Sequence, residues 1–133
     1  MQELYDRLVN DLKLIGIEVN YTLELKPFSK KFFGCYNPNS NKVTIYVYQD
    51  VENHRLYPYE SILLTAIHES VHCIQWNDPD FVRIKGVMHN EQFYELYNMY
   101  KCRAKALQTT RALNLLKEVL NSEKLNSQGT FSV

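Results

Sequence analysis

The residues with the clearest chemical potential are His68, Glu69 and His72, which form a His-Glu-Ser-Val-His motif near the middle of the chain. On a helix, residues four positions apart lie on one face, with Cβ atoms about 5–6 Å apart. Two imidazoles placed in this way can each bring a nitrogen to about 2.0–2.1 Å from one zinc ion, and the neighbouring carboxylate can accept a proton from an attacking water. A shuffled chain of this composition would contain only about 0.01 such motifs. The motif therefore indicates a zinc-dependent hydrolase.

A catalytic zinc site needs a third protein ligand and an open coordination position. Three candidates follow the motif, namely His89, Glu91 and Glu95. His89 precedes the expected start of a later helix and could reach back toward the motif. Glu91 and Glu95, one turn apart on that helix, could instead complete a site of two histidines and one glutamate. Acidic residues at a helix start are also favoured by the helix dipole, so the spacing leaves the choice open, including the absence of a third ligand.

The motif could also be a structural feature of a buried helix, in which the histidines only satisfy local hydrogen bonds. Its apolar neighbours place the helix in the core: Ile62, Leu63, Leu64, Ala66, Ile67, Val71, Ile74 and Trp76. Two buried histidines beside a carboxylate are costly without a metal ion. We therefore favour the metal-site interpretation.

The helix that carries the motif should span about 58–76, because Pro58 suits a first turn and Pro79 disfavours helix before it. We expect a connecting loop over 78–88. No Gly or Pro occurs from 87 to 128, which predicts one long helix or a helical hairpin that starts near Asn90 and is most easily broken at Thr109-Thr110.

The N-terminal half has the patterns of a helix and three strands. Apolar residues at helical spacing predict a helix over residues 3–15. Strict alternation of apolar and polar residues predicts a strand over 17–25. A hairpin is predicted from two strand-like segments, 32–36 and 43–48, on either side of an Asn- and Pro-rich turn. A polar loop should follow through 50–57. The predicted fold class is α+β: an N-terminal helix, a small three-stranded and mainly antiparallel sheet, the motif helix, and a C-terminal helix or helical hairpin.

Composition excludes several classes of protein. The chain has 133 residues, 45% of them hydrophobic and 23% charged, which predicts one folded domain and not a disordered chain. Fifteen basic residues balance fifteen acidic ones, which argues against electrostatic binding of nucleic acid by the protein surface as a whole. No stretch approaches the ~20 apolar residues of a membrane span. Three cysteines that lie far apart in the sequence, and that we expect to be buried, favour a cytoplasmic location. The many Asn and Tyr residues hint at a phage source, in which case the location would be the cytoplasm of the host.

Two local patterns and the order of elements resemble the SprT-like zinc metallopeptidases, a group that includes the Spartan proteases. The first is Gly34-Cys35-Tyr36-Asn37-Pro38 followed by Lys42-Val43-Thr44-Ile45, and the second is His89-x-x-x-Phe93-Tyr94-x-Leu96. The resemblance implies a zincin-like domain over residues 1–120, Zn²⁺ as cofactor and His89 as third ligand. The chain would be a minimal member, because it lacks the four-cysteine zinc ribbon of many members. The polar end, 121–133, should be a flexible tail.

These observations predict a zinc-dependent metallopeptidase that acts on a protein or peptide, with Glu69 as general base. Tyr94 or Tyr97 could help by donating a hydroxyl to the developing oxyanion. The alternative is a catalytically inactive, zinc-stabilised protein-interaction module, which could be phage-encoded. A basic run on the late helix would allow a weak contact with nucleic acid: Lys101, Arg103, Lys105, Arg111 and Lys117. The sequence leaves the oligomeric state open.

Overall fold

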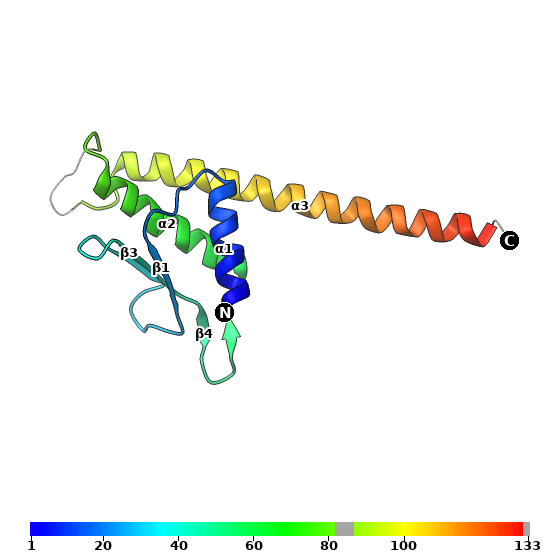
Figure 1. Ribbon diagram of the computed structural model, residues 1–133, viewed down its shortest axis with the longest axis horizontal. Helices are drawn as coiled ribbons and strands as arrows, with labels where there is room; N and C mark the ends of the chain where they lie inside the picture. The colour runs from blue at the N-terminus through cyan, green and yellow to red at the C-terminus, as the bar shows by residue number, and fades with distance from the viewer. Residues whose placement is uncertain (82–86, 132–133) are drawn as a thin grey trace. The chain divides into compact units, whose positions relative to one another are not determined.

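The structure is a computed structural model that describes the backbone of residues 1–81 and 87–131 and, within this range, the side chains up to residue 124. The chain divides into two compact units, Met1–Lys101 and Cys102–Val133. The first unit contains helices α1 (Gln2–Leu14) and α2 (Tyr59–Asn77) and all strands, together with the start of a third helix (Figure 1). The expected domain of residues 1–120 and flexible tail of 121–133 stay predictions.

A three-stranded sheet lies next to α2. Its strands are β1 (Thr22–Lys26), β2 (Gly34–Asn37) and β3 (Lys42–Tyr46), in the order β1-β3-β2. The predicted hairpin of β2 and β3 is antiparallel, as expected. However, β3 pairs with β1 in parallel, so the sheet is mixed and the prediction of a mainly antiparallel sheet is wrong. The chain between β1 and β2 crosses to the far edge of the sheet, and the hairpin then returns β3 alongside β1 in the same direction.

Two segments outside this sheet also differ from the expectation. The alternating pattern over 17–25 forms a paired strand only from Thr22, although Ile17 and Tyr21 are still buried. The expected polar loop over 50–57 contains part of a small second sheet, formed by β4 (Tyr48–Asp50) and β5 (Arg55–Leu56).

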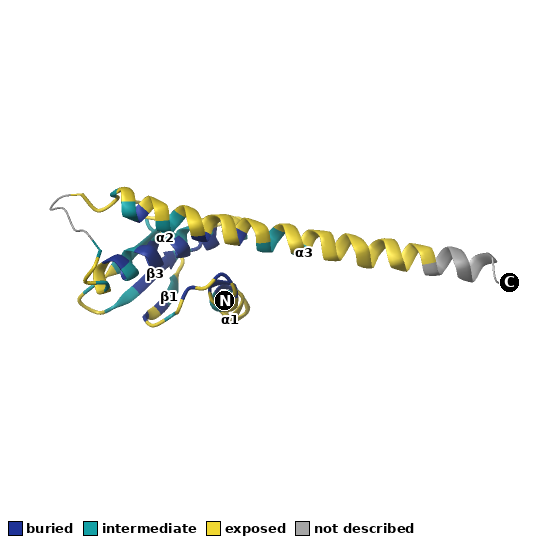
Figure 2. Ribbon diagram, turned by 90° about the horizontal axis from the view of Figure 1, so that it is seen from above, coloured by how far each residue is buried: buried dark blue, intermediate teal, exposed yellow. Residues whose placement is uncertain are grey.

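The core lies between α2 and the sheet, with α1 alongside α2 (Figure 2). Each fully buried aliphatic side chain contributes about 1.5–3 kcal/mol relative to its exposed state. A buried polar link also joins the two helices, because the Tyr59 hydroxyl donates a hydrogen bond to Asp11 at 2.6 Å. The fully buried side chains include Leu8, Leu12, Val43, Ile45, Ala66, Ile67 and Val71.

The third helix, α3 (Glu91–Phe131), begins where the sequence predicts. The Asn90 side-chain oxygen accepts a hydrogen bond from the Phe93 N–H at 2.9 Å, which caps the first turn. The helix passes through Thr109 without a break, because the Thr109 hydroxyl bonds to the Lys105 carbonyl within the helix. Of the two predicted alternatives, one long helix or a helical hairpin, the structure has the single helix. No helix in the described residues is long and apolar enough to cross a membrane.

The motif helix α2 also has the predicted limits. Pro58 precedes it in extended geometry, and its last residue, Asn77, folds its side chain back onto the Cys73 carbonyl at 2.8 Å. The loop expected over 78–88 is only partly visible, because residues 82–86 lie outside the described residues. Of the three cysteines, Cys73 is buried but Cys102 is exposed, so the expectation that all would be buried is wrong.

Candidate metal centre

Three histidine side chains from two segments converge on one point. His68 and His72 lie one turn apart on α2, and His89 lies just before α3. The His68 and His72 Nε2 atoms are 3.2 Å apart, and the His89 Nε2 atom is 3.1 Å from each of them. Among the described residues, these three form the group of side chains that could hold a metal ion. The two alternative ligands, Glu91 and Glu95, are exposed and do not belong to this group.

The distances between the nitrogens fit a tetrahedral zinc ion. Three nitrogens at about 2.0–2.1 Å from one zinc, with tetrahedral angles, would be about 3.3–3.4 Å apart. The observed separations of 3.1–3.2 Å are close to this value. Neutral imidazoles that turn their unprotonated nitrogens toward one point also repel each other unless a cation lies between them. The arrangement of His68, His72 and His89 therefore fits a metal site with three histidine ligands.

The surroundings of the two α2 histidines favour the neutral form that binds metal. Burial, together with the adjacent His68 and His89, lowers the pKa of His72 to about 4. Burial also lowers the pKa of His68, with a smaller contribution from His89. Both α2 histidines are therefore uncharged at neutral pH and ready to act as ligands.

A buried aromatic ring packs against all three histidines. The ring of Phe93, which has no exposed surface, has its centroid 4.6–4.9 Å from each histidine ring. Tyr97, one turn further along α3, stacks on Phe93. The Asn90 cap fixes the first turn of α3, and this turn orients Phe93. Because His89 directly precedes Asn90, the same turn holds His89 near α2.

Gln75 supports the site from behind His72. Its side chain is buried, and a hydrogen bond between it and the His72 ring raises the pKa of His72 slightly against the effect of burial. A hydrogen-bonding partner of this kind limits the orientation of a metal-binding histidine.

A buried pair of hydroxyl groups anchors α2 between its two histidines. Ser70 donates to the Ala66 carbonyl at 2.6 Å. Because this uses the only hydroxyl proton of Ser70, the Tyr21 hydroxyl must be the donor in the 2.6 Å bond between Tyr21 and Ser70. Burial raises the pKa of Tyr21 to about 12. The bond ties the start of β1 to the middle of the motif.

The histidines open into a cleft of about 480 Å³ in the first unit. Glu69 lines this cleft but is only 7% exposed, and burial raises its pKa to about 7. A carboxyl group with such a pKa can both accept and release a proton at neutral pH. The lining residues are Phe32, Gly34, Cys35, Tyr36, Pro38, His68, Glu69, His72, Gln75, Trp76, Val87, Met88 and His89.

The β2–β3 hairpin forms the wall opposite α2. At one end, a Cβ atom on Gly34 would be 2.8 Å from the Thr65 methyl group, so only glycine allows this approach of β2 to the helix. At the other end, the Asn77 side chain donates to the Tyr36 hydroxyl at 3.4 Å. Strand β2 thus runs beside the part of α2 that carries His68, Glu69 and His72.

The remaining candidate residues lie around the cleft. Tyr94 is exposed, and Tyr97 is half-buried with its ring 5.6 Å from that of His68. Neither lines the cleft, so an oxyanion role for either stays a prediction. Sequence reasoning gave no role to Phe93, because His89 precedes α3 and helix spacing therefore does not relate the two side chains.

Comparisons with known proteins agree with this geometry. No protein-family model matches the sequence, and no curated protein matches it either. Among solved structures, the chain is similar to Wss1 from Saccharomyces cerevisiae, with a TM-score of 0.58 and 17% identity. The match covers 80% of this chain and 78% of that chain. The chain therefore has the α+β fold of Wss1, and three histidines in the cleft of this chain can hold a metal ion.

Proposed function

We propose that the protein is a zinc-dependent metallopeptidase. The observation that carries this proposal is the convergence of three histidine nitrogens within 3.2 Å of one another, beside a buried carboxyl group in a cleft. The Wss1-like fold supports it independently. Zinc is the preferred metal because three histidines with one open position are typical of catalytic zinc sites.

Each residue of the site has a separate task. His68, His72 and His89 would hold the zinc, which supplies Lewis acidity and lowers the pKa of a water molecule toward about 7. Glu69 accepts a proton from the attacking water and then gives it to the departing amine, which its pKa near 7 permits. Gln75 keeps the His72 ring in orientation, and Phe93 excludes water from below the histidines.

The shape of the cleft suits an extended peptide. Strand β2 is an edge strand of the three-stranded sheet and borders the cleft. Extended peptides commonly dock along edge strands. A protein or peptide is therefore the proposed substrate, whereas a contact with nucleic acid through the late basic residues stays a prediction.

Replacing Glu69 with Gln tests the proposal. Glu69→Gln should keep about one zinc per chain and the wild-type fold, because neither the ligands nor the side-chain volume changes. Cleavage of an unfolded protein such as casein should fall at least ~100-fold, the usual effect of losing a general base. Zinc content, circular dichroism and cleavage rate measure these quantities.

Glu60→Gln is the matched control, because Glu60 is an exposed residue on the same helix, away from the cleft. It should keep full activity. Equal cleavage by the Glu69 variant and the wild type would contradict the catalytic role of Glu69. A zinc-loaded wild type without any cleavage would favour the zinc-stabilised interaction module.

A further inference from the structure

One end of the cleft is lined by large apolar side chains that remain exposed. Trp76 is 49% exposed, Met88 65% and Val87 44%. Exposed apolar groups that gather in a concave surface are typical of ligand-binding sites. Their burial by a ligand would contribute about 25 cal/mol for each Å² of apolar surface removed from water.

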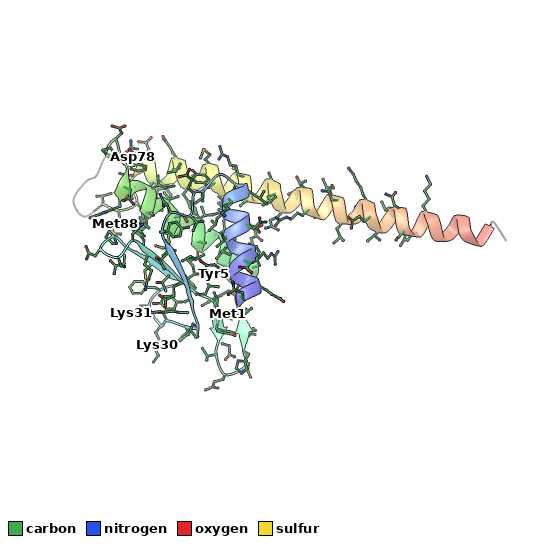
Figure 3. The ribbon with its side chains drawn as sticks, viewed as in Figure 1. Met1, Tyr5, Lys30, Lys31, Asp78 and Met88 are labelled. Carbon is green, nitrogen blue, oxygen red and sulfur yellow. The ribbon has the colours of Figure 1, made fainter. Side chains whose placement is uncertain are left out.

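Trp76 lies on the His72 side of the metal centre, and Val87 and Met88 (the latter labelled in Figure 3) line the same cleft. Trp76 follows His72 by four residues on α2, which places it on the same helix face and about 6 Å further along the axis. Met88 directly precedes His89 in the chain. Tyr36, whose hydroxyl is bonded to Asn77 at the end of α2, brings the hairpin to the same place.

The charge of the cleft restricts what can bind there. Apart from the histidines, Glu69 is the only Asp, Glu, Lys or Arg side chain that lines the cleft among the described residues. Away from the proposed zinc ion, an acidic substrate side chain would lose water without gaining a cation from these described residues. A lysine or arginine side chain would compete for Glu69, which the reaction needs. An apolar side chain meets neither penalty.

We propose that Tyr36, Pro38, Trp76, Val87 and Met88 form an apolar subsite that binds a bulky apolar side chain, such as Leu, Met or Phe, of an extended peptide. The placement beside the metal centre means that cleavage occurs next to this residue. The selectivity of cleavage rests on the proposed peptidase function, whereas the binding of the apolar side chain does not.

Binding can be measured without catalysis, because Trp76 is the only tryptophan in the chain and lines the subsite. The zinc-loaded Glu69→Gln protein is titrated with capped peptides Ala-Gly-X-Gly-Ala, in which X is Leu, Phe, Asp, Lys or Gly. The Leu and Phe peptides should change Trp76 fluorescence and bind at least ~10-fold more tightly than the Asp, Lys and Gly peptides, as expected for a filled apolar pocket. Equal affinity for all five peptides would overturn the proposal.

Substitution of Met88 then tests the subsite in the active protein. Met88→Ala should lower the ratio of kcat/KM for the Leu peptide to kcat/KM for the Gly peptide at least ~5-fold, because only the Leu peptide makes the apolar contact. Met99→Ala is the matched control, because Met99 is also exposed but does not line the cleft. An unchanged ratio in Met88→Ala would overturn the proposal.

The two experiments separate the subsite from the peptidase function. Selective binding of the Leu and Phe peptides, without cleavage of any peptide by the wild type, would support the subsite and contradict the proposed function. Cleavage of all five peptides at similar rates would support the proposed function and overturn the subsite.

Discussion

Tyr21 shows how a single residue outside the cleft can determine where the metal ligands lie. Its hydroxyl donates to Ser70, which lies between His68 and His72 on α2. Both side chains are buried, so no water can replace the bond if it is lost. Burial disfavours the ionised form of the Tyr21 hydroxyl, which makes the stability of this part of the fold sensitive to alkaline pH.

The raised pKa of Tyr21 predicts a loss of stability above pH 10. The unfolded protein releases this proton near pH 10 and the folded protein near pH 12, so the unfolded state binds fewer protons in this range and stability falls as pH rises. Between pH 9 and 12, the free energy of unfolding should fall about 2–3 kcal/mol more in the wild type than in Tyr21→Phe. Urea unfolding of both proteins measures this difference, and parallel curves would contradict the assignment.

At the same scale, sequence spacing predicted part of the metal centre and left the rest open. His68, Glu69 and His72 follow from helix geometry, because a helix fixes the relative positions of residues four apart. The choice between His89, Glu91 and Glu95 needed a family resemblance, because a loop separates them from the motif. Side chains that approach only in the folded chain, such as Tyr21 beside Ser70, have no comparable local signal.

At the scale of elements, the contact between β2 and α2 determines the width of the cleft. At Gly34, an added Cβ would meet the Thr65 methyl at 2.8 Å and the Thr44 carbonyl oxygen at 2.9 Å. The second contact is with backbone at the centre of the sheet, which cannot move away easily.

Gly34→Ala should therefore destabilise the protein by about 1–3 kcal/mol, the usual cost of overpacking. It should also weaken peptide cleavage, because β2 must move away from α2. Thermal unfolding and the cleavage rate measure the two effects.

Thr65→Ser provides the control, because it removes the methyl group and retains the hydroxyl that bonds to Ser61. The single Thr65→Ser variant should lose little stability. Combined with Gly34→Ala, it should restore part of the loss, since only one of the two close contacts is relieved. Full stability of Gly34→Ala by itself would show that β2 and α2 are less tightly fitted than described.

The elements themselves were predictable where one local pattern dominates. Pro58 and Pro79 located the two ends of α2, and the Asn90 cap located the start of α3. The parallel pairing of β1 with β3 was missed, because alternation shows that a strand is half-buried but not which neighbour it pairs with. The continuity of α3 through Thr109 shows that a weak helix former need not end a helix.

At the scale of the whole molecule, the candidate site belongs to one unit. All cleft-lining residues lie within Met1–Lys101, whereas residues 112–124 are exposed. Removal of residues 113–133 should therefore leave zinc affinity and peptide cleavage within about twofold of the full chain, because surface truncations away from core contacts have little effect. Competition with a chelator and the cleavage rate measure this, and a tenfold weaker zinc affinity would mean that the late part of α3 contributes to the site.

The central claim is that His68, His72 and His89 together hold one zinc ion, and zinc content tests it most directly. Elemental analysis after dialysis against a moderate chelator should find about one zinc per wild-type chain and much less in His89→Ala, because losing one of three ligands weakens the site. His54→Ala should keep the wild-type content, because His54 is an exposed histidine outside the cluster. A wild-type protein that neither contains zinc nor takes it up, or a His89→Ala protein that retains it equally well, would contradict the account.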